Sequence, residues 1–209
     1  MKSRPMPPMP DVIFDTMVIS NFAKAGQLDL LRSLYSDNAC CTGFVVAEVL
    51  RGFRQGHTDL EALVQLLLDG WPRQEELITP TERRLYASIS VSLGDGESSC
   101  LALAAQRGYV FACDDRLARS EAVRLEIPLT GTVGILIKAV RIGAIDLKKA
   151  NTILKRMTQA GFYAPVARIT PDMVTGETSS GKRLVETLRG RATIKMTADA
   201  IIAFTRGED

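Results

Sequence analysis

The stretch VIFDTMVISNF, residues 12–22, constrains the fold more than any other part of the chain. Three apolar residues lead into Asp15, and apolar residues resume after Thr16. A short apolar run of this kind predicts a buried strand over residues 11–15. The strand therefore ends in a carboxylate, and a carboxylate is costly to bury unless something compensates its charge.

Strand-like and helix-like segments alternate along the rest of the chain. Further strands are predicted at residues 38–45, 109–115 and 127–132. Amphipathic patterns predict helices at residues 26–35, 46–56, 58–70, 79–94, 94–108, 116–126, 133–143 and 144–161. This alternation predicts an α/β fold with a mostly parallel sheet and helices on both faces.

Length and composition favour one globular domain with an appendage. The chain has 209 residues, of which 46% are hydrophobic, and this is sufficient for one full core. No run of eighteen apolar residues occurs, so no transmembrane helix is expected. Residues 1–10 are basic and rich in proline, which predicts a flexible leader rather than a signal peptide. We therefore expect a cytoplasmic protein that does not bind membranes.

The cysteines and the single histidine do not follow a metal-binding pattern. Cys40 and Cys41 are adjacent, and Cys100 and Cys113 are isolated. We expect all four to be small buried residues in a reducing compartment. His57 lies in a polar stretch, and we expect it in a solvated loop, so a histidine-based metal site or catalytic triad is disfavoured.

Charge is distributed unevenly along the chain. Residues 1–132 contain 13 Lys and Arg against 17 Asp and Glu, whereas residues 133–209 contain 13 against 7. The first part is therefore acidic and the second part basic. A basic C-terminal region can bind nucleic acid, or it can bind the acidic part of its own chain.

Four acidic residues lie where such a fold would bring them together. Asp15 ends the first strand, Glu48 lies in the helix after the second, Glu97 opens the helix after LGDG, and Asp115 follows the third strand. In parallel sheets, sites form beyond the carboxyl ends of the strands. Each residue taken alone has a structural explanation: a helix cap, a turn, a charge at a helix N-terminus or a solvated helix position.

The joint arrangement points to a metal ion. Two unit charges about 4 Å apart repel by roughly 4 kcal/mol at an effective dielectric constant near 20. A divalent cation removes this penalty, and ligands that are all oxygen fit Mg²⁺ or Mn²⁺ better than zinc. A metal ion held in this way can activate water for attack on a phosphodiester.

Four blocks of sequence resemble PIN-domain ribonucleases, in particular VapC-like toxins of toxin–antitoxin pairs. The blocks are VIFDTMVISNFAKAGQLDLL, VVAEVLRG, LGDGESSCLALA and DDRLARSEAVRLEIPLTGTVGIL, and the match covers about residues 11–165. The resemblance implies a three-layer α/β/α nuclease domain over residues 11–170. It also implies metal-dependent cleavage of RNA and assembly as a homodimer.

The resemblance assigns site residues by position. Asp15, Glu48, Glu97 and Asp115 match the acidic catalytic quartet that binds metal, and Thr16 and Asn21 match polar positions beside it. Asp114 is an alternative metal ligand, and the choice between Asp114 and Asp115 stays open.

The C-terminal region extends beyond the family domain. Residues 171–183 are rich in Thr, Ser and Gly and predict a linker. Residues 184–209 resemble the C-terminal segment of a VapB-like antitoxin, with an apolar helix face at Ile201, Ile202 and Phe204. Arg189, Arg191 and Lys195 supply positive charge. We expect this tail to inhibit the nuclease, in cis or across a dimer, although a basic tail that binds RNA remains an alternative.

Two other functions are compatible with parts of the sequence. A phosphatase of the haloacid dehalogenase type also has an aspartate at a strand end, but it needs a second aspartate where Met17 stands. A catalytically silent module that binds RNA or a toxin–antitoxin partner is the non-enzymatic alternative. The complete acidic quartet argues against the silent module.

Overall fold

The computed structural model describes residues 10–176. The predicted leader and the predicted inhibitory tail, including Arg189, Arg191 and Lys195, lie outside the described residues. The described residues divide into two compact units, residues 10–130 and residues 131–176. Each unit is described by itself.

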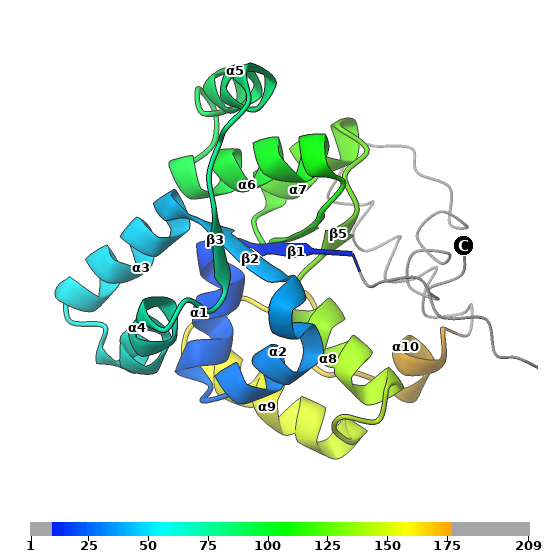
Figure 1. Cartoon of the computed structure of the whole chain (residues 1–209). Helices are drawn as coiled ribbons and strands as arrows, with labels where there is room; N and C mark the ends of the chain where they lie inside the picture. Colours follow the sequence, from blue (N-terminus) through cyan, green and yellow to red (C-terminus); the bar gives the residue numbers. More distant parts are fainter. Residues whose placement is uncertain (1–9, 177–209) are drawn as a thin grey trace, which may run out of the picture. The chain divides into compact units, whose positions relative to one another are not determined.

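The first unit contains a five-stranded sheet (Figure 1). Its strands are β1 (Val12–Phe14), β2 (Ala39–Thr42), β3 (Arg73–Glu75), β4 (Val110–Ala112) and β5 (Leu129–Thr130). The order in the sheet is β3-β2-β1-β4-β5, and every pairing is parallel. The prediction of an α/β fold built on a parallel sheet is therefore confirmed.

Helices cover both faces of this sheet. In the first unit they are α1 (Thr16–Lys24), α2 (Leu28–Tyr35), α3 (Gly43–Arg54), α4 (Glu61–Leu68), α5 (Pro80–Ile89), α6 (Asp95–Arg107) and α7 (Arg116–Arg124). Two short 3₁₀ helices, η1 (Ser36–Asn38) and η2 (Thr58–Leu60), complete the described elements of the unit. Figure 1 shows α6 and α7 on one side of the sheet and α1 and α2 on the other.

The central strand β1 is buried because it has only apolar residues and neighbours on both sides. All three of its residues are buried, as parallel strands covered by helices usually are. The ring of Phe14 meets Tyr35 of α2 edge to face, with centroids 5.3 Å apart. Cys40, Cys41, Cys100 and Cys113 are buried free thiols, as predicted. They belong to a core cluster that includes Ile13, Leu101, Leu103, Phe111 and Ala118.

The structure corrects several predicted elements. Strand β3 was not predicted, because Arg73, Gln74 and Glu75 are polar and β3 lies at the edge of the sheet. The strand predicted over residues 38–45 ends at Thr42, whose side chain accepts a hydrogen bond from the Val45 N–H and so caps α3. Helix α1 was also missed, although Asp15 caps it.

The second unit contains three described helices, α8 (Thr132–Arg141), α9 (Leu147–Gln159) and α10 (Pro171–Thr175). Helix α10 lies at the start of the segment predicted as a linker. Arg141 of α8 donates hydrogen bonds to the carbonyl oxygens of Met173 and Val174 in α10. Among the described residues, no helix has the length and apolar character needed to cross a bilayer.

Candidate active site

The candidate site lies at the point of the sheet where the chain changes direction. From β1 the chain proceeds to β2 and β3 on one side, and it returns to β4 and β5 on the other. Neighbouring strands β1 and β4 therefore form a topological switch point, where parallel α/β folds place their ligand sites. Asp15 follows β1 directly, and its N–H donates to the carbonyl of Ala112 at the end of β4, 3.0 Å away.

Asp15 is almost completely buried, with 3% of its surface exposed. It is the N-cap residue of α1, and its Oδ2 accepts a hydrogen bond from the Met17 N–H at 3.2 Å. Capping satisfies one backbone donor that the first turn of a helix leaves unpaired. The capping role and a site role are compatible, because the second carboxylate oxygen can still bind a ligand.

Glu48 reaches the same region from α3. The hydroxyl of Thr16 donates to its Oε2, and the N–H of Gly96 donates to its Oε1 at 3.3 Å. A Cβ atom at position 96 would lie 2.7 Å from Oε2 and 2.9 Å from Oε1. Gly96 is therefore needed for the Glu48 carboxylate to approach the first turn of α6.

Glu97 and Asp115 lie at two further helix N-termini. The Glu97 carboxylate accepts a hydrogen bond from the Gly94 N–H at 2.9 Å, at the start of α6. Asp115 caps α7 by accepting from the Ala118 N–H at 2.8 Å. The positive ends of helix dipoles favour negative charge at such positions, so α1, α6 and α7 stabilise the acids that sequence analysis grouped together.

The four carboxylates of Asp15, Glu48, Glu97 and Asp115, termed the acidic cluster below, interact electrostatically. Burial raises the pKa of Asp15 to about 7, and the charges of Glu97 and Glu48 add to this increase. Burial also raises the pKa of Glu97, with further contributions from Asp115 and Glu48. Among residues 10–176, no Lys or Arg forms an ion pair with any member. The cluster therefore carries negative charge that the described part of the chain does not neutralise.

The three remaining predicted site residues lie beside the cluster. Thr16 orients Glu48 through its hydroxyl. Asn21, on α1, donates from Nδ2 to the Oδ2 of Asp114 at 3.3 Å. Asp114 thus contacts a polar neighbour, whereas Asp115 is the residue that interacts electrostatically with Glu97.

The carboxylate oxygens of the acidic cluster suit a hard divalent cation, although in this structure the side chains are not arranged to coordinate one ion together. The donors are carboxylate oxygens, which Mg²⁺ and Mn²⁺ prefer. The pKa of Asp15 is raised by its burial and, to a smaller extent, by the charges of Glu97 and Glu48. Within the described range 10–176, however, no group of three or more His, Cys, Asp and Glu side chains is gathered closely enough to hold one metal ion. Binding an ion would require these carboxylates to turn towards a common centre.

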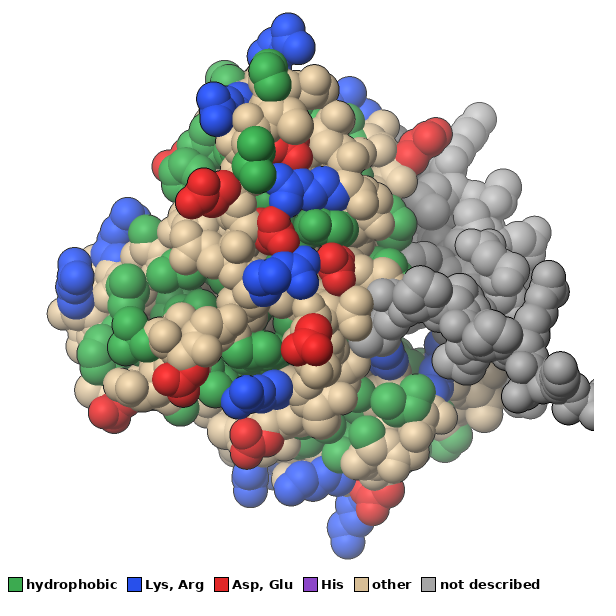
Figure 2. All heavy atoms as spheres, viewed as in Figure 1, with side chains coloured by type: hydrophobic (Ala, Val, Ile, Leu, Met, Phe, Trp, Pro, Cys, Tyr) green, Lys and Arg blue, Asp and Glu red, His purple; other side chains and the backbone are tan. Residues whose placement is uncertain are grey.

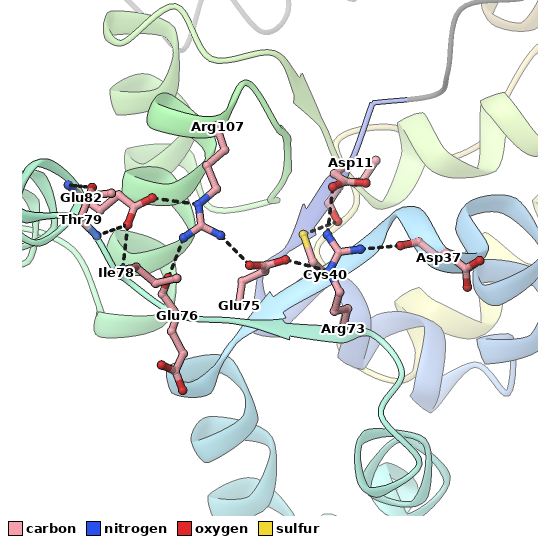
Figure 3. Close-up of polar contacts among 11 residues, drawn as sticks. Asp11, Asp37, Cys40, Arg73, Glu75, Glu76, Ile78, Thr79, Glu82 and Arg107 are labelled. Carbon is pink, nitrogen blue, oxygen red and sulfur yellow. Dashed lines mark hydrogen bonds and ion pairs between the residues drawn. The ribbon is translucent and has the colours of Figure 1, made fainter.

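A second set of acids, Asp11, Glu75 and Glu82, is paired with arginine. Arg73 forms ion pairs with Asp11 at 2.9 Å and Glu75 at 2.7 Å. Arg107 pairs with Glu75 at 2.5 Å and with Glu82 at 2.8 Å (Figure 3). We call these five residues the arginine network. Acidic and basic side chains alternate across the middle of the face shown in Figure 2.

Sequence reasoning missed two residues that shape the site. Gly96 leaves room for the Glu48 carboxylate, and this is visible only in the structure, where the two residues lie close together. Phe44, the second residue of α3, is 38% exposed, and its ring stacks on Tyr86 of α5 with centroids 5.2 Å apart. The sequence signal that was available for Phe44 is its spacing of four residues from Glu48, which places both on one helix face.

The fold and the site together define a class of protein: a parallel α/β domain with an acidic site at the carboxyl edge of its sheet. A sequence model of the PIN domain matches residues 11–173, and the chain therefore belongs to the PIN-domain family. Membership indicates nuclease activity in general, and nucleases of this family generally use divalent metal ions. Searches of curated proteins and of solved structures gave no match.

Proposed function

We propose that this protein is a metal-dependent endoribonuclease that hydrolyses RNA phosphodiesters, and that it is the toxin of a toxin–antitoxin pair. The observation that carries the proposal is the acidic cluster. Its four carboxylates come from four separate segments of the chain, and burial and mutual repulsion hold the pKa of Asp15 near 7. This is the charge pattern expected of a site that is completed by a cation.

Each member of the cluster has a defined role in the proposed reaction. Asp15, Glu48, Glu97 and Asp115 would hold Mg²⁺ or Mn²⁺, with Asp114 as an additional ligand. When bound, the ion supplies Lewis acidity towards a phosphoryl oxygen and lowers the pKa of water. Thr16 and the Gly96 N–H fix the orientation of Glu48. Asp15 would release its proton near neutral pH when the ion arrives, since a metal ligand must be deprotonated.

Cleavage of RNA tests the proposal directly. Wild-type protein with Mg²⁺ or Mn²⁺ should cleave RNA, and Asp15→Asn should reduce the rate by more than about 100-fold, because a metal ligand is lost. Asparagine is an equally good N-cap, so α1 should stay intact. Asp29→Asn, which changes an exposed aspartate in the first turn of α2, serves as the matched control. Equal cleavage by Asp15→Asn and wild type would rule out the proposed site.

We further propose that residues 184–209 act as an antitoxin-like inhibitory tail, in cis or across a homodimer. The support is electrostatic: the cluster lacks positive charge, and Arg189, Arg191 and Lys195 could provide it through bidentate or point-charge contacts. Replacing these three residues with alanine, or truncating the chain after Gly176, should raise nuclease activity. Unchanged activity in both variants would contradict inhibition by the tail.

A further inference from the structure

Exposed apolar side chains lie close in sequence to three members of the acidic cluster. Met17 is 46% exposed and lies two residues after Asp15, and Leu117 is 64% exposed and lies two residues after Asp115. Phe44 is four residues before Glu48 and is 38% exposed. Single exposed apolar side chains are common on protein surfaces, so the contacts of each one decide whether it can serve a ligand.

Phe44, on α3, is held by a side chain from a second helix, α5. Its ring stacks on Tyr86, with an angle of 24° between the two planes. The Tyr86 hydroxyl donates to Oδ1 of Asp95 at 2.8 Å, and Asp95 is the first residue of α6, the helix that also carries Glu97. The aromatic pair is therefore linked to α3 on one side and to α6 on the other.

The exposed face of α3 combines three kinds of side chain. Phe44, Glu48 and Arg51 are spaced at four and three residues, so they lie along one face of the helix. Arg51 is exposed. The face therefore presents, in order, an aromatic ring, a carboxylate of the acidic cluster and a guanidinium group. An aromatic ring and a guanidinium on either side of a cleavage site complement a base and a phosphate of a single-stranded nucleic acid.

We propose that Phe44 is a base-stacking residue: an unpaired nucleobase of the RNA stacks on its exposed ring, while Arg51 contacts a backbone phosphate. The inference rests on the proposed ribonuclease function and deepens it, because it assigns the residues that would hold a base and a phosphate of the substrate beside the acidic cluster. Stacking on an aromatic ring tolerates any base, since every base has a π face.

Binding can be measured on the full chain carrying Asp15→Asn, so that the RNA stays intact. Fluorescence anisotropy would compare a single-stranded RNA with an abasic oligonucleotide of the same length and phosphate content. Phe44→Ala should weaken binding of the RNA by about 5- to 150-fold, which corresponds to the loss of one base–aromatic stack. It should leave binding of the abasic oligonucleotide unchanged, and Phe44→Trp should restore the affinity for RNA.

Two controls separate stacking from a structural role. Leu68→Ala removes an apolar side chain that is 73% exposed on α4 and should bind RNA as the parent does. Arg51→Ala should weaken binding of both oligonucleotides. It should also reduce the slope of the logarithm of the binding constant against the logarithm of the salt concentration by about 0.7, the value for one phosphate contact on a single strand. Circular dichroism checks that each variant is folded, and Phe44→Leu, which keeps the apolar volume, should behave as Phe44→Ala does.

Specific outcomes would overturn the inference. If the parent protein and Phe44→Ala bind RNA with equal affinity, the inference is wrong, and a protein-docking role would fit this surface instead. Equal weakening of the RNA and the abasic oligonucleotide would show that Phe44 acts by packing against Tyr86. If wild-type protein cleaves RNA and Phe44→Ala does so with the same KM, only the stacking inference fails. If wild-type protein cleaves no RNA with Mg²⁺ or Mn²⁺, the proposed function fails.

Discussion

The acidic cluster and the arginine network place carboxylates in opposite electrostatic environments within one unit. In the arginine network, the hydrogen bond from Arg107 Nε lowers the pKa of Glu82 to about 2. In the acidic cluster, burial and neighbouring carboxylates raise the pKa of Asp15 to about 7. Both side chains are nearly inaccessible to water. Burial raises the pKa of both groups, but at Glu82 the hydrogen bond and charge of Arg107 outweigh it, whereas at Asp15 the charges of Glu97 and Glu48 add to it. The first environment supports the fold, and the second suits a site that binds a cation.

The arginine network joins distant parts of the chain. Arg107, at the end of α6, contacts Glu75 of the edge strand and Glu82 of α5, and it also donates to the carbonyl of Glu76. Thr79 and Glu82 form a capping box at the start of α5, a reciprocal pair of side-chain to backbone hydrogen bonds. The network thus holds α5 and β3 in place, and α5 carries Tyr86.

Breaking the network should have the largest effect on stability. Arg107→Ala leaves the buried Glu82 without its partner, and loss of one member of a buried ion pair typically costs about 3–5 kcal/mol. Urea denaturation at neutral pH measures the free energy of unfolding. Arg124→Ala, which breaks the exposed Arg124–Glu121 pair, is the control and should have little effect. If both variants lost the same small amount, the ion pairs would not be important for stability.

Removing a charge from the acidic cluster should instead stabilise the protein. The pKa of Asp15 is raised in the folded state from 3.8 to about 7, so the folded protein binds more protons than the unfolded chain between these values. The contribution of Asp15 to the free energy of unfolding is therefore most favourable below about pH 4, and it is lost as pH rises to about 7. Asp15→Asn at pH 8 should add about 2–4 kcal/mol to the free energy of unfolding, since one pKa unit is worth about 1.4 kcal/mol.

The pH dependence of unfolding checks this prediction. The gain from Asp15→Asn should shrink as pH falls from 7 towards 4. Glu82 contributes in the opposite direction: its pKa is lowered from 4.5 to about 2, so its stabilisation is complete above pH 4.5 and is lost as pH falls to about 2. Glu82→Gln should therefore flatten the acid side of the curve. A gain from Asp15→Asn that did not change with pH would show that charge is not the cause.

The smallest predicted effect comes from adding one methyl group at Gly96. In Gly96→Ala, the new Cβ would lie 2.7 Å from Glu48 Oε2, so the carboxylate must move, at a cost of about 1–3 kcal/mol for overpacking. Metal binding measured by calorimetry should weaken accordingly. Gly43→Ala is the matched control, because its Cβ would approach only the side-chain amide of Gln74, at 3.1 Å. If Gly96→Ala bound metal with unchanged affinity, Glu48 would not be a metal ligand.

Much of the fold could be predicted from local patterns. The strands β1 and β4 are apolar runs that end in acids, and α6 runs from LGDG to Gly108 as the sequence indicated. The predicted acids were found to interact electrostatically, and the structural explanations for three of them also hold, since Asp15, Glu97 and Asp115 stabilise helix N-termini. β3 was missed because an edge strand of three polar residues has no apolar pattern.

By itself, the sequence determined which residues end each strand and begin each helix, because capping, apolar runs and turns depend on neighbours a few positions apart. Only the tertiary structure decided which carboxylates form ion pairs with arginine and which lie close to other carboxylates. Glu48 and Gly96 are 48 positions apart, and Arg107 and Glu82 are 25 apart. The charge environment of a carboxylate depends on such distant neighbours, which local sequence does not specify.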